Sequence, residues 1–168
     1  MTRRLMVAVI GAGQAPVPVL QLARELGTAL IEAGFRVVSG GRGGVMQAVS
    51  EGARSASEYR EGDVVGIVPG DDARDANPFV DIVIVSGMGI MRNALLVRSA
   101  DAVVAVAGGA GTLSELAMAW QLDKPIIALE VAGWSGRLAG ERIDDRPRAP
   151  ILGASRVEDV IAALRALG

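Results

Sequence analysis

The fold is decided by the stretch Val-Val-Ala-Val-Ala-Gly-Gly-Ala-Gly-Thr-Leu-Ser-Glu, which occupies residues 103–115. Its first five residues are apolar without alternation, a pattern typical of a strand buried on both faces, as in a parallel sheet. The glycines that follow expose backbone N–H groups where a helix begins, and the positive end of a helix suits an anion. Thr112 adds a hydroxyl at the predicted cap, and Glu115 lies one turn later. The stretch predicts an anion-binding turn with a carboxylate beside it.

The composition narrows the class of protein. The chain has 168 residues, enough for one domain, which we expect to span 1–168. Hydrophobic residues make up 51% but aromatic residues only 3%, so small aliphatic side chains fill the predicted core. The net charge of −2 does not favour nucleic-acid binding. Neither a membrane-spanning run nor a signal peptide is recognisable, and we therefore expect a cytoplasmic protein without a membrane partner.

Missing residue types exclude several chemistries. The chain has no Cys and no His, which excludes thiolate nucleophiles, zinc-thiolate sites, imidazole bases and imidazole metal ligands. Lys124 is the only lysine. Any catalysis must therefore use carboxylates, arginines, hydroxyls and backbone donors.

Strands and helices alternate along the chain. Strands are predicted at residues 5–10, 35–38, 63–68, 80–85, 101–107 and 126–130, with a short apolar segment at 151–152. Helices are predicted up to about residue 33, from 45, from Ser86 or Gly87, up to about 122, and over 157–167. This order predicts a Rossmann-like three-layer α/β/α domain with a mostly parallel sheet of six or seven strands. The position of the fourth strand stays open, and residues 132–150 are predicted to be a loop, either a lid or a plain excursion.

Three glycine-bearing turns follow predicted strands, at residues 11–13, 40–44 and 108–111. The carboxyl ends of parallel strands share one edge, and ligands bind there. The first turn matches the dinucleotide fingerprint only in part, because Pro16 replaces the third glycine and Ser39 replaces the acid that holds a ribose. The chain also lacks a P-loop. The turns therefore favour a phosphate site of another kind.

Each of these features also has a purely structural interpretation. Glycines permit close approach of helix and strand, so the turns could serve packing alone. Arg42 could simply be solvated, and Arg92 could be a surface arginine that covers apolar neighbours. An acid in the first turn of a helix, such as Glu115, is stabilised by the helix dipole without any function.

Three blocks of the sequence resemble the motifs of the LOG/SLOG superfamily, a Rossmann-like group formerly mislabelled as lysine decarboxylases. The blocks occupy residues 40–46, 91–93 and 108–115, and the last is similar to P-G-G-x-G-T-x-x-E with Ala107 in place of Pro. Residues 65–72 and 77–81 are similar to a small bacterial branch of this superfamily, which is related to the molybdenum-cofactor carrier proteins.

The resemblance implies a phosphoribohydrolase, which cleaves the N-glycosidic bond of a nucleoside 5′-monophosphate to free base and ribose 5-phosphate, with Arg92 and Glu115 catalytic. A carboxylate would stabilise the oxocarbenium-like state or activate water. No metal and no cofactor are implied, and the partners are a small phosphorylated ligand and, in a homodimer or larger homo-oligomer, further copies of the chain. The predicted nucleotide- and phosphate-binding residues are Gly11, Gly13, Gly40, Gly41, Arg42, Gly43, Gly44, Met88, Arg92, Gly108, Gly109, Ala110, Gly111 and Thr112.

The chain departs from the LOG pattern at three places, and these leave an alternative open. Met88 and Gly89 stand in place of a Met-His pair, Asn93 replaces a Lys, and Ala107 replaces the Pro. The alternative is a non-catalytic carrier or sensor of a phosphorylated ligand such as the molybdenum cofactor. Lysine decarboxylation is not supported, because the only lysine lies at a predicted strand entrance, away from the glycine turns.

Overall fold

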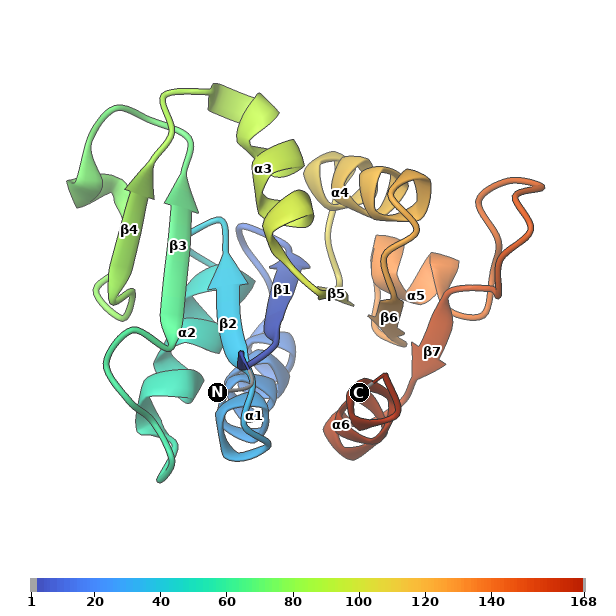
Figure 1. The fold of residues 1–168 in the computed structure, drawn as a ribbon, viewed down its shortest axis with the longest axis horizontal. Coiled ribbons are helices and arrows are strands. Elements are labelled where there is room, and N and C mark those ends of the chain that lie inside the picture. The colour runs from blue at the N-terminus through green and yellow to red at the C-terminus, as the bar shows by residue number, and fades with distance from the viewer. Residues whose placement is uncertain (1–2, 168) are drawn as a thin grey trace.

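Seven parallel strands form the central sheet of residues 3–167, the part of the chain that the computed structural model describes (Figure 1). Their order across the sheet is β4-β3-β2-β1-β5-β6-β7, and each neighbouring pair is parallel. The strands are β1 (Met6–Gly11), β2 (Arg36–Ser39), β3 (Val64–Val68), β4 (Ile82–Val85), β5 (Ala102–Val106), β6 (Ile126–Leu129) and β7 (Leu152–Ala154).

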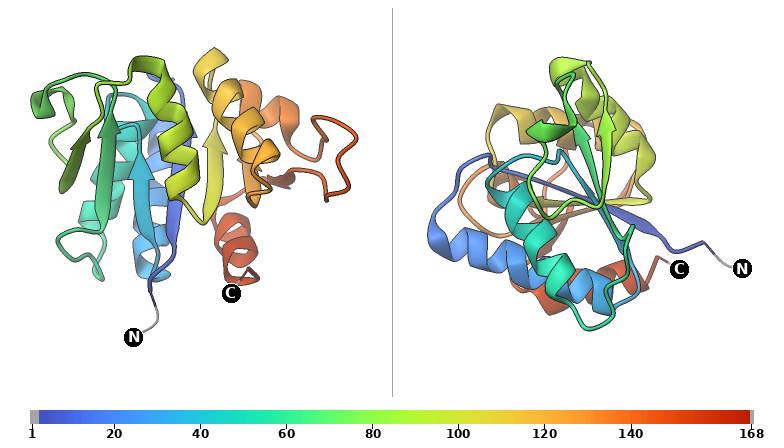
Figure 2. Two further views of the ribbon diagram at one scale, coloured as in Figure 1. Left: turned by 45° about the horizontal axis from the view of Figure 1, so that its top comes forward. Right: turned by 90° about the vertical axis from the view of Figure 1, so that its left-hand side faces the viewer.

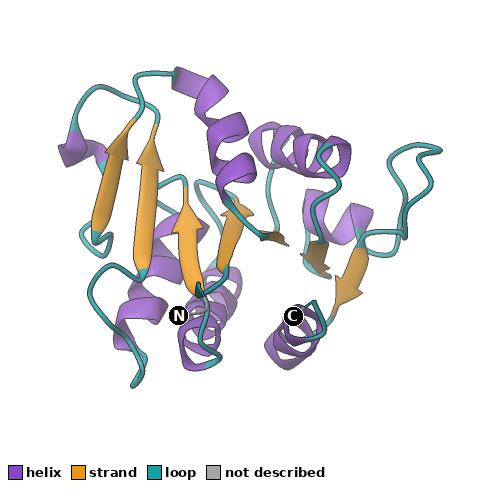
Figure 3. Cartoon of the chain, viewed as in Figure 1, coloured by secondary structure: helices purple, strands orange, loops and turns teal. Residues whose placement is uncertain are grey.

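Helices cover both faces of this sheet (Figures 2 and 3). One face carries α1 (Val17–Glu32), α2 (Val45–Ser55) and α6 (Val157–Arg165), and the other carries α3 (Arg92–Ser99), α4 (Ala110–Gln121) and α5 (Trp134–Leu138). The Rossmann-like α/β prediction is confirmed, with seven strands, all of them parallel. Residues 1, 2 and 168 of the predicted domain lie outside the described residues. Within the described part, no helix is long and apolar enough to cross a membrane.

The uniform apolar character of the strands reflects burial on both faces. In β1, Val7 and Val9 pack with the α1 and α2 side, whereas Ala8 and Ile10 pack with the α3 and α4 side. All four side chains are at most 1% exposed. Successive side chains of a strand point to opposite faces, so a strand covered by helices on both sides needs an apolar residue at every position.

Carboxylates tie the amino edge of the sheet together. Asp101 accepts hydrogen bonds from both terminal nitrogens of Arg3 and from the backbone N–H of Met6, at 2.6 to 2.8 Å. Asp81 accepts from the Tyr59 hydroxyl at 2.6 Å and from backbone N–H groups. These acids are used for structure at the edge opposite the glycine turns.

The structure settles the position of the fourth strand and corrects the start of the helix after it. Strand β4 lies at the edge of the sheet, parallel to β3, and residues 69–81 connect them with one short 3₁₀ turn, η1 (Ala73–Asp75). The prediction of a helix from Ser86 or Gly87 was wrong, because α3 begins at Arg92 after the 3₁₀ turn η2 (Gly89–Met91). Gly87 and Gly89 have φ angles of 60° and 55°, which a right-handed helix cannot accommodate.

The predicted loop at 132–150 is only partly irregular, because it contains α5. The remainder is attached to the C-terminal end of α4. Arg148 donates to the carbonyl oxygens of Trp120 and Lys124 at 2.8 and 2.6 Å, and its guanidinium lies 4.4 Å from the Trp120 ring centre. The indole of Trp120 donates to Asp144 at 2.6 Å. This attachment holds residues 141–150 at the end of α4 that lies away from the glycine turn.

Candidate functional site

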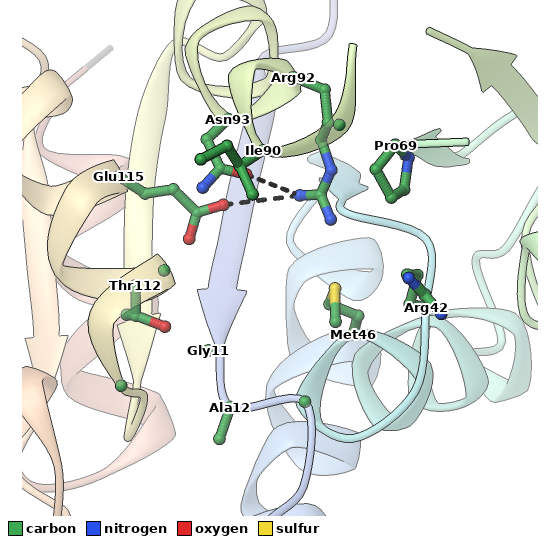
Figure 4. A pocket seen from close by; sticks show the side chains of 14 residues that line it. Gly11, Ala12, Arg42, Met46, Pro69, Ile90, Arg92, Asn93, Thr112 and Glu115 are labelled. Atoms are coloured by element: carbon green, nitrogen blue, oxygen red, sulfur yellow. Dashed lines mark hydrogen bonds and ion pairs between the residues drawn. The ribbon is translucent and has the colours of Figure 1, made fainter. Parts of the chain in front are cut away.

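A crevice opens at the carboxyl edge of the sheet, where the order of the strands reverses between β1 and β5. The helix after β1 packs on one face and the helix after β5 packs on the other, so the turns that precede them diverge. The resulting cavity has a volume of about 410 Å³, which lies in the range of small-molecule sites. Figure 4 shows side chains from both halves of the sheet pointing into it.

Eight of the predicted site residues line this cavity, and seven do not. The lining residues are Gly11, Gly13, Arg42, Arg92, Gly109, Gly111, Thr112 and Glu115. The predicted residues outside the lining are Gly40, Gly41, Gly43, Gly44, Met88, Gly108 and Ala110. The roles assigned to these residues stay predictions.

The turn before α4 supplies backbone donors. Gly109 is the N-cap residue, and no side chain within the described residues caps this helix. The first N–H groups of a helix have no acceptor within it, and they carry the positive end of the dipole. The prediction that Thr112 lies at the cap was wrong, because Thr112 is buried in the first turn, after the N-cap, and makes no capping hydrogen bond within the described residues. The start of α4 therefore presents unused donors to the crevice.

The turn at residues 40–44, which we call the second glycine turn, packs against the first glycine turn. The backbone N–H of Val45, the first residue of α2, donates to the carbonyl oxygen of Ala12 at 2.9 Å. A methyl group on Gly44 would overlap Ala12 and Gly13. Arg42 alone of this turn faces the cavity. The glycines here allow the first two glycine turns to touch.

Arg92 and Glu115 are brought together inside the crevice, as Figure 4 shows. Nη1 of Arg92 lies 3.7 Å from Oε1 of Glu115 and donates to Oδ1 of Asn93 at 3.1 Å. The side-chain amide of Asn93 donates in turn to the hydroxyl of Ser114 at 3.2 Å. Arg92 is only 9% exposed, and its Nε finds no hydrogen-bond partner within residues 3–167. The guanidinium is thus buried with incomplete compensation.

Burial disfavours the charged form of both groups. Desolvation raises the pKa of Glu115 to about 7, against the opposing attraction of Arg92. Desolvation also lowers the pKa of Arg92, and the nearby charge of Arg42 acts in the same direction. A carboxyl that titrates near neutrality can serve as an acid, as a base, or as a proton-dependent neighbour of a bound anion.

Six lining residues were not predicted. They are Ala12, Met46, Pro69, Gly89, Ile90 and Asn93. Met46, Pro69 and Ile90 give the crevice an apolar portion beside its two arginines. Met46 is the last residue of the block 40–46, and Gly89 is one of the departures from the LOG pattern, so both residues carried a signal although neither was predicted to line the site. Asn93 lies in the block 91–93 that carries the resemblance, and it was also noted as a departure from the LOG pattern.

Ala107 adopts a conformation that the proline of the LOG pattern could not. Its φ angle is 56°, whereas a proline ring holds φ near −65°. Its N–H donates to the hydroxyl of Ser135 at 2.7 Å, and that hydroxyl donates to the carbonyl of Leu129 at 2.7 Å. The backbone N–H groups of Trp134 and Ser135 donate to the carbonyls of Gly108 and Ala107 at 3.0 Å. The N-terminal turn of α5 therefore braces the turn before α4.

Comparisons with known proteins agree with this architecture. A model of the SLOG cluster4 family matches residues 4–161. An uncharacterised protein of Archaeoglobus fulgidus is 39% identical over 127 residues, which are 75% of this chain and 80% of that protein.

Solved structures give the same picture over nearly the whole chain. The molybdenum cofactor binding protein from the phototrophic bacterium Rippkaea orientalis is similar with a TM-score of 0.86 and 32% identity, over 99% of both chains. The molybdenum cofactor carrier protein from Chlamydomonas reinhardtii is similar with a TM-score of 0.82 and 28% identity, over 98% of both chains.

Substitution of Ala107 tests the brace between α5 and the turn. We expect Ala107→Pro to lower the free energy of unfolding by about 3 kcal/mol or more, because the ring forbids the observed φ and removes the donor to Ser135. Ala107→Gly is the matched control and should leave stability near that of the wild type, since glycine accepts this φ. Urea unfolding of the three proteins measures the difference. Equal stability of the proline and glycine variants would contradict the assignment.

Glu115 should make stability depend on pH. Its pKa is about 7 in the folded chain against an ordinary value of 4.5, so the folded state binds more protons in this window. The free energy of unfolding therefore decreases as the pH rises from 4.5 through 7, by on the order of 3 kcal/mol. We expect Glu115→Gln to be more stable than the wild type at pH 8, with the difference vanishing near pH 4.

Urea unfolding at pH 4, 6 and 8 measures this effect. Glu58→Gln, at an exposed position, is the control and should keep the wild-type pH dependence. If the free energy of unfolding depends on pH in the same way in Glu115→Gln and in the wild type, the prediction is wrong.

Proposed function

Since the chain belongs to the SLOG cluster4 family, we propose that its crevice binds a small phosphorylated ligand and carries it intact, as a molybdenum-cofactor carrier does. The family match and the solved structures confirm the resemblance to the SLOG branch near these carriers. The observation that carries the proposal is the meeting of the α4 N-terminus with Arg92 and Arg42 in one crevice.

The donor set suits a phosphate group. Uncapped N–H groups at a helix start bind phosphate oxygens, and a guanidinium adds charge-assisted hydrogen bonds. Arg92 is pre-positioned and its Nε is unpaired within the described residues, so an anion would complete its interactions. The apolar portion formed by Met46, Pro69 and Ile90 can cover the ring system of the ligand.

Hydrolysis of a nucleoside 5′-monophosphate is the second candidate. One observation favours it: Arg92 and Glu115 lie 3.7 Å apart inside the cavity, and the pKa of Glu115 is about 7. A carboxylate near an oxocarbenium-like centre can activate water. We place the carrier function, which the sequence left open as the alternative to hydrolysis, first, because the chain shares its fold and about 30% of its sequence with proteins that bind or carry the molybdenum cofactor.

Ligand binding tests the proposal. We expect freshly purified chain to retain a phosphorylated ligand in native mass spectrometry, and added adenosine 5′-monophosphate or molybdenum cofactor to raise the melting temperature. Arg92→Ala should weaken binding at least tenfold. A tenfold loss corresponds to about 1.4 kcal/mol, which a charge-assisted hydrogen bond can supply. Arg98→Ala removes the same charge from an exposed position of the same helix and should bind like the wild type.

The same samples separate the two candidate functions. A carrier releases no free base from the nucleotide, whereas a hydrolase releases base and ribose 5-phosphate, detectable by chromatography, and loses this product in Glu115→Gln. If none of the phosphorylated compounds shifts the melting temperature, both functions are wrong.

Self-association is part of the proposal, since homo-oligomers are implied by the resemblance. Exposed apolar side chains gather in residues 82–95, the segment that we call the β4–α3 surface. Strand β4 lies at the edge of the sheet. Charged residues and prolines usually protect an edge strand from pairing with another chain, and β4 has neither. We propose that a second copy covers this surface. Its exposed members are Ile82, Ile84, Val85, Met88, Ile90, Met91 and Leu95.

Charge substitution on the β4–α3 surface tests this part. We expect a wild-type dimer in size-exclusion chromatography with light scattering, and a monomer for Ile84→Asp, because a buried unpaired charge is unfavourable. Val17→Asp changes another exposed apolar residue, 73% exposed at the start of α1, and should remain dimeric. A monomeric wild type, or a dimeric Ile84→Asp, would contradict the assignment.

A further inference from the structure

Gly40 lies against the guanidinium of Arg92. A methyl group built on Gly40 would stand 2.6 Å from Nη2 and 2.7 Å from Cζ of Arg92, and closer still to Nη1. These separations are far below van der Waals contact, so an alanine and the observed guanidinium cannot occupy these positions together. Gly40 itself is not among the residues that line the cavity. Its effect on the crevice is therefore exerted through Arg92.

The second glycine turn cannot move aside to make room. On one side, the hydroxyl of Ser39 accepts from the N–H of Gly41 at 3.1 Å. Asn77 holds the same turn from outside, because its backbone N–H donates to the carbonyl of Gly41 at 2.7 Å and its side-chain amide donates to that of Arg42 at 3.0 Å. The contact of Val45 with the first turn fixes the other end. The backbone around Gly40 is thus held by hydrogen bonds on several sides.

Arg92 is the partner that can move. Its side chain is long, its Nε has no partner within residues 3–167, and Nη1 makes one hydrogen bond to Asn93 and a 3.7 Å approach to Glu115. Figure 4 shows the guanidinium reaching from α3 into the crevice between Glu115 and Pro69. A side chain at position 40 would therefore displace the guanidinium and leave the turn in place.

We infer that Gly40 is a positioning residue, whose missing side chain lets the Arg92 guanidinium lie against the second glycine turn and face the ligand. This inference deepens the proposed function and rests on it for the ligand, but the placement of Arg92 can be tested without one. In this role Gly40 positions Arg92, whereas the sequence predicted that Gly40 contacts the phosphate itself.

The chain offers a matched control within the same turn. Gly40 and Gly43 both have φ angles outside the left-handed region, so alanine strains the backbone at neither position. A methyl group on Gly43 would meet its nearest neighbour, the carbonyl oxygen of Gly13, at 3.8 Å, which is ordinary contact. Gly43→Ala therefore adds the same atom without touching Arg92.

The first measurement needs no ligand. The Nε–H signal of Arg92 in ¹H–¹⁵N spectra, identified by its loss in Arg92→Lys, should shift and exchange faster with water in Gly40→Ala. It should keep its wild-type position and exchange in Gly43→Ala. An Arg92 signal that is unchanged in Gly40→Ala overturns the inference, whatever the ligand experiments give.

The second measurement is a double-mutant cycle, with adenosine 5′-monophosphate as the probe in calorimetry. We expect Gly40→Ala to weaken binding about tenfold, and Arg98→Ala, the exposed control on α3, to bind like the wild type. The combined Gly40→Ala/Arg92→Ala variant should bind within about twofold of Arg92→Ala alone, because the alanine acts only through the guanidinium. Additive losses in the double variant would overturn the inference.

Two further outcomes remain informative. If Gly40→Ala does not fold, the inference requires that Arg92→Ala in the same chain restores folding, and continued failure to fold contradicts it. If the wild type binds no phosphorylated compound while the Arg92 signal still moves in Gly40→Ala, the proposed function fails and the inference stands.

Discussion

A buried guanidinium is the feature on which the crevice depends. Removal of a charged group from water costs several kcal/mol unless hydrogen bonds or an opposite charge compensate. Arg92 receives only partial compensation, from one hydrogen bond to Asn93 and from Glu115 at 3.7 Å. Its neighbours hold it in place. Gly40 leaves space for the guanidinium, and Asn93, which accepts its hydrogen bond, donates to the hydroxyl of Ser114. A bound anion would supply an interaction that residues 3–167 do not.

The sheet predicted from the sequence was correct because its signals are local. Apolar runs without alternation and the glycines after them identify parallel strands and the edge at which their turns meet. The second glycine turn shows where this reasoning ends. Gly44 packs closely against the Ala12 carbonyl. A glycine that packs in this way and a glycine that contacts a ligand look the same in the sequence. Only the fold distinguishes them, and it places Arg42, rather than the glycines around it, in the cavity wall.

The features that were missed depend on contacts between residues far apart in the chain. The short helix α5 is fixed by bonds between Ser135 and Ala107, 28 residues away, and not by a helical pattern of its own. The start of α3 was misplaced because two glycines with left-handed φ angles, Gly87 and Gly89, delay it. Arg92 and Glu115 were paired by resemblance, but neither their burial nor the participation of Asn93 could be read from spacing.

The pKa of Glu115 connects the site to the proposed carrier function. An ionised Glu115 would compete with a bound phosphate for Arg92, whereas a protonated one leaves the guanidinium to the ligand. Glu115 is desolvated, Arg92 opposes the resulting rise in its pKa, and the charge of Arg42 acts on Arg92. A bound phosphate adds negative charge beside Glu115 and therefore favours its protonated form, so that binding takes up a proton. In a carrier, this coupling would hold the ligand more tightly below neutral pH than above it. A hydrolase that relies on the ionised carboxylate would lose turnover in the same range. The two functions thus place opposite demands on a single proton.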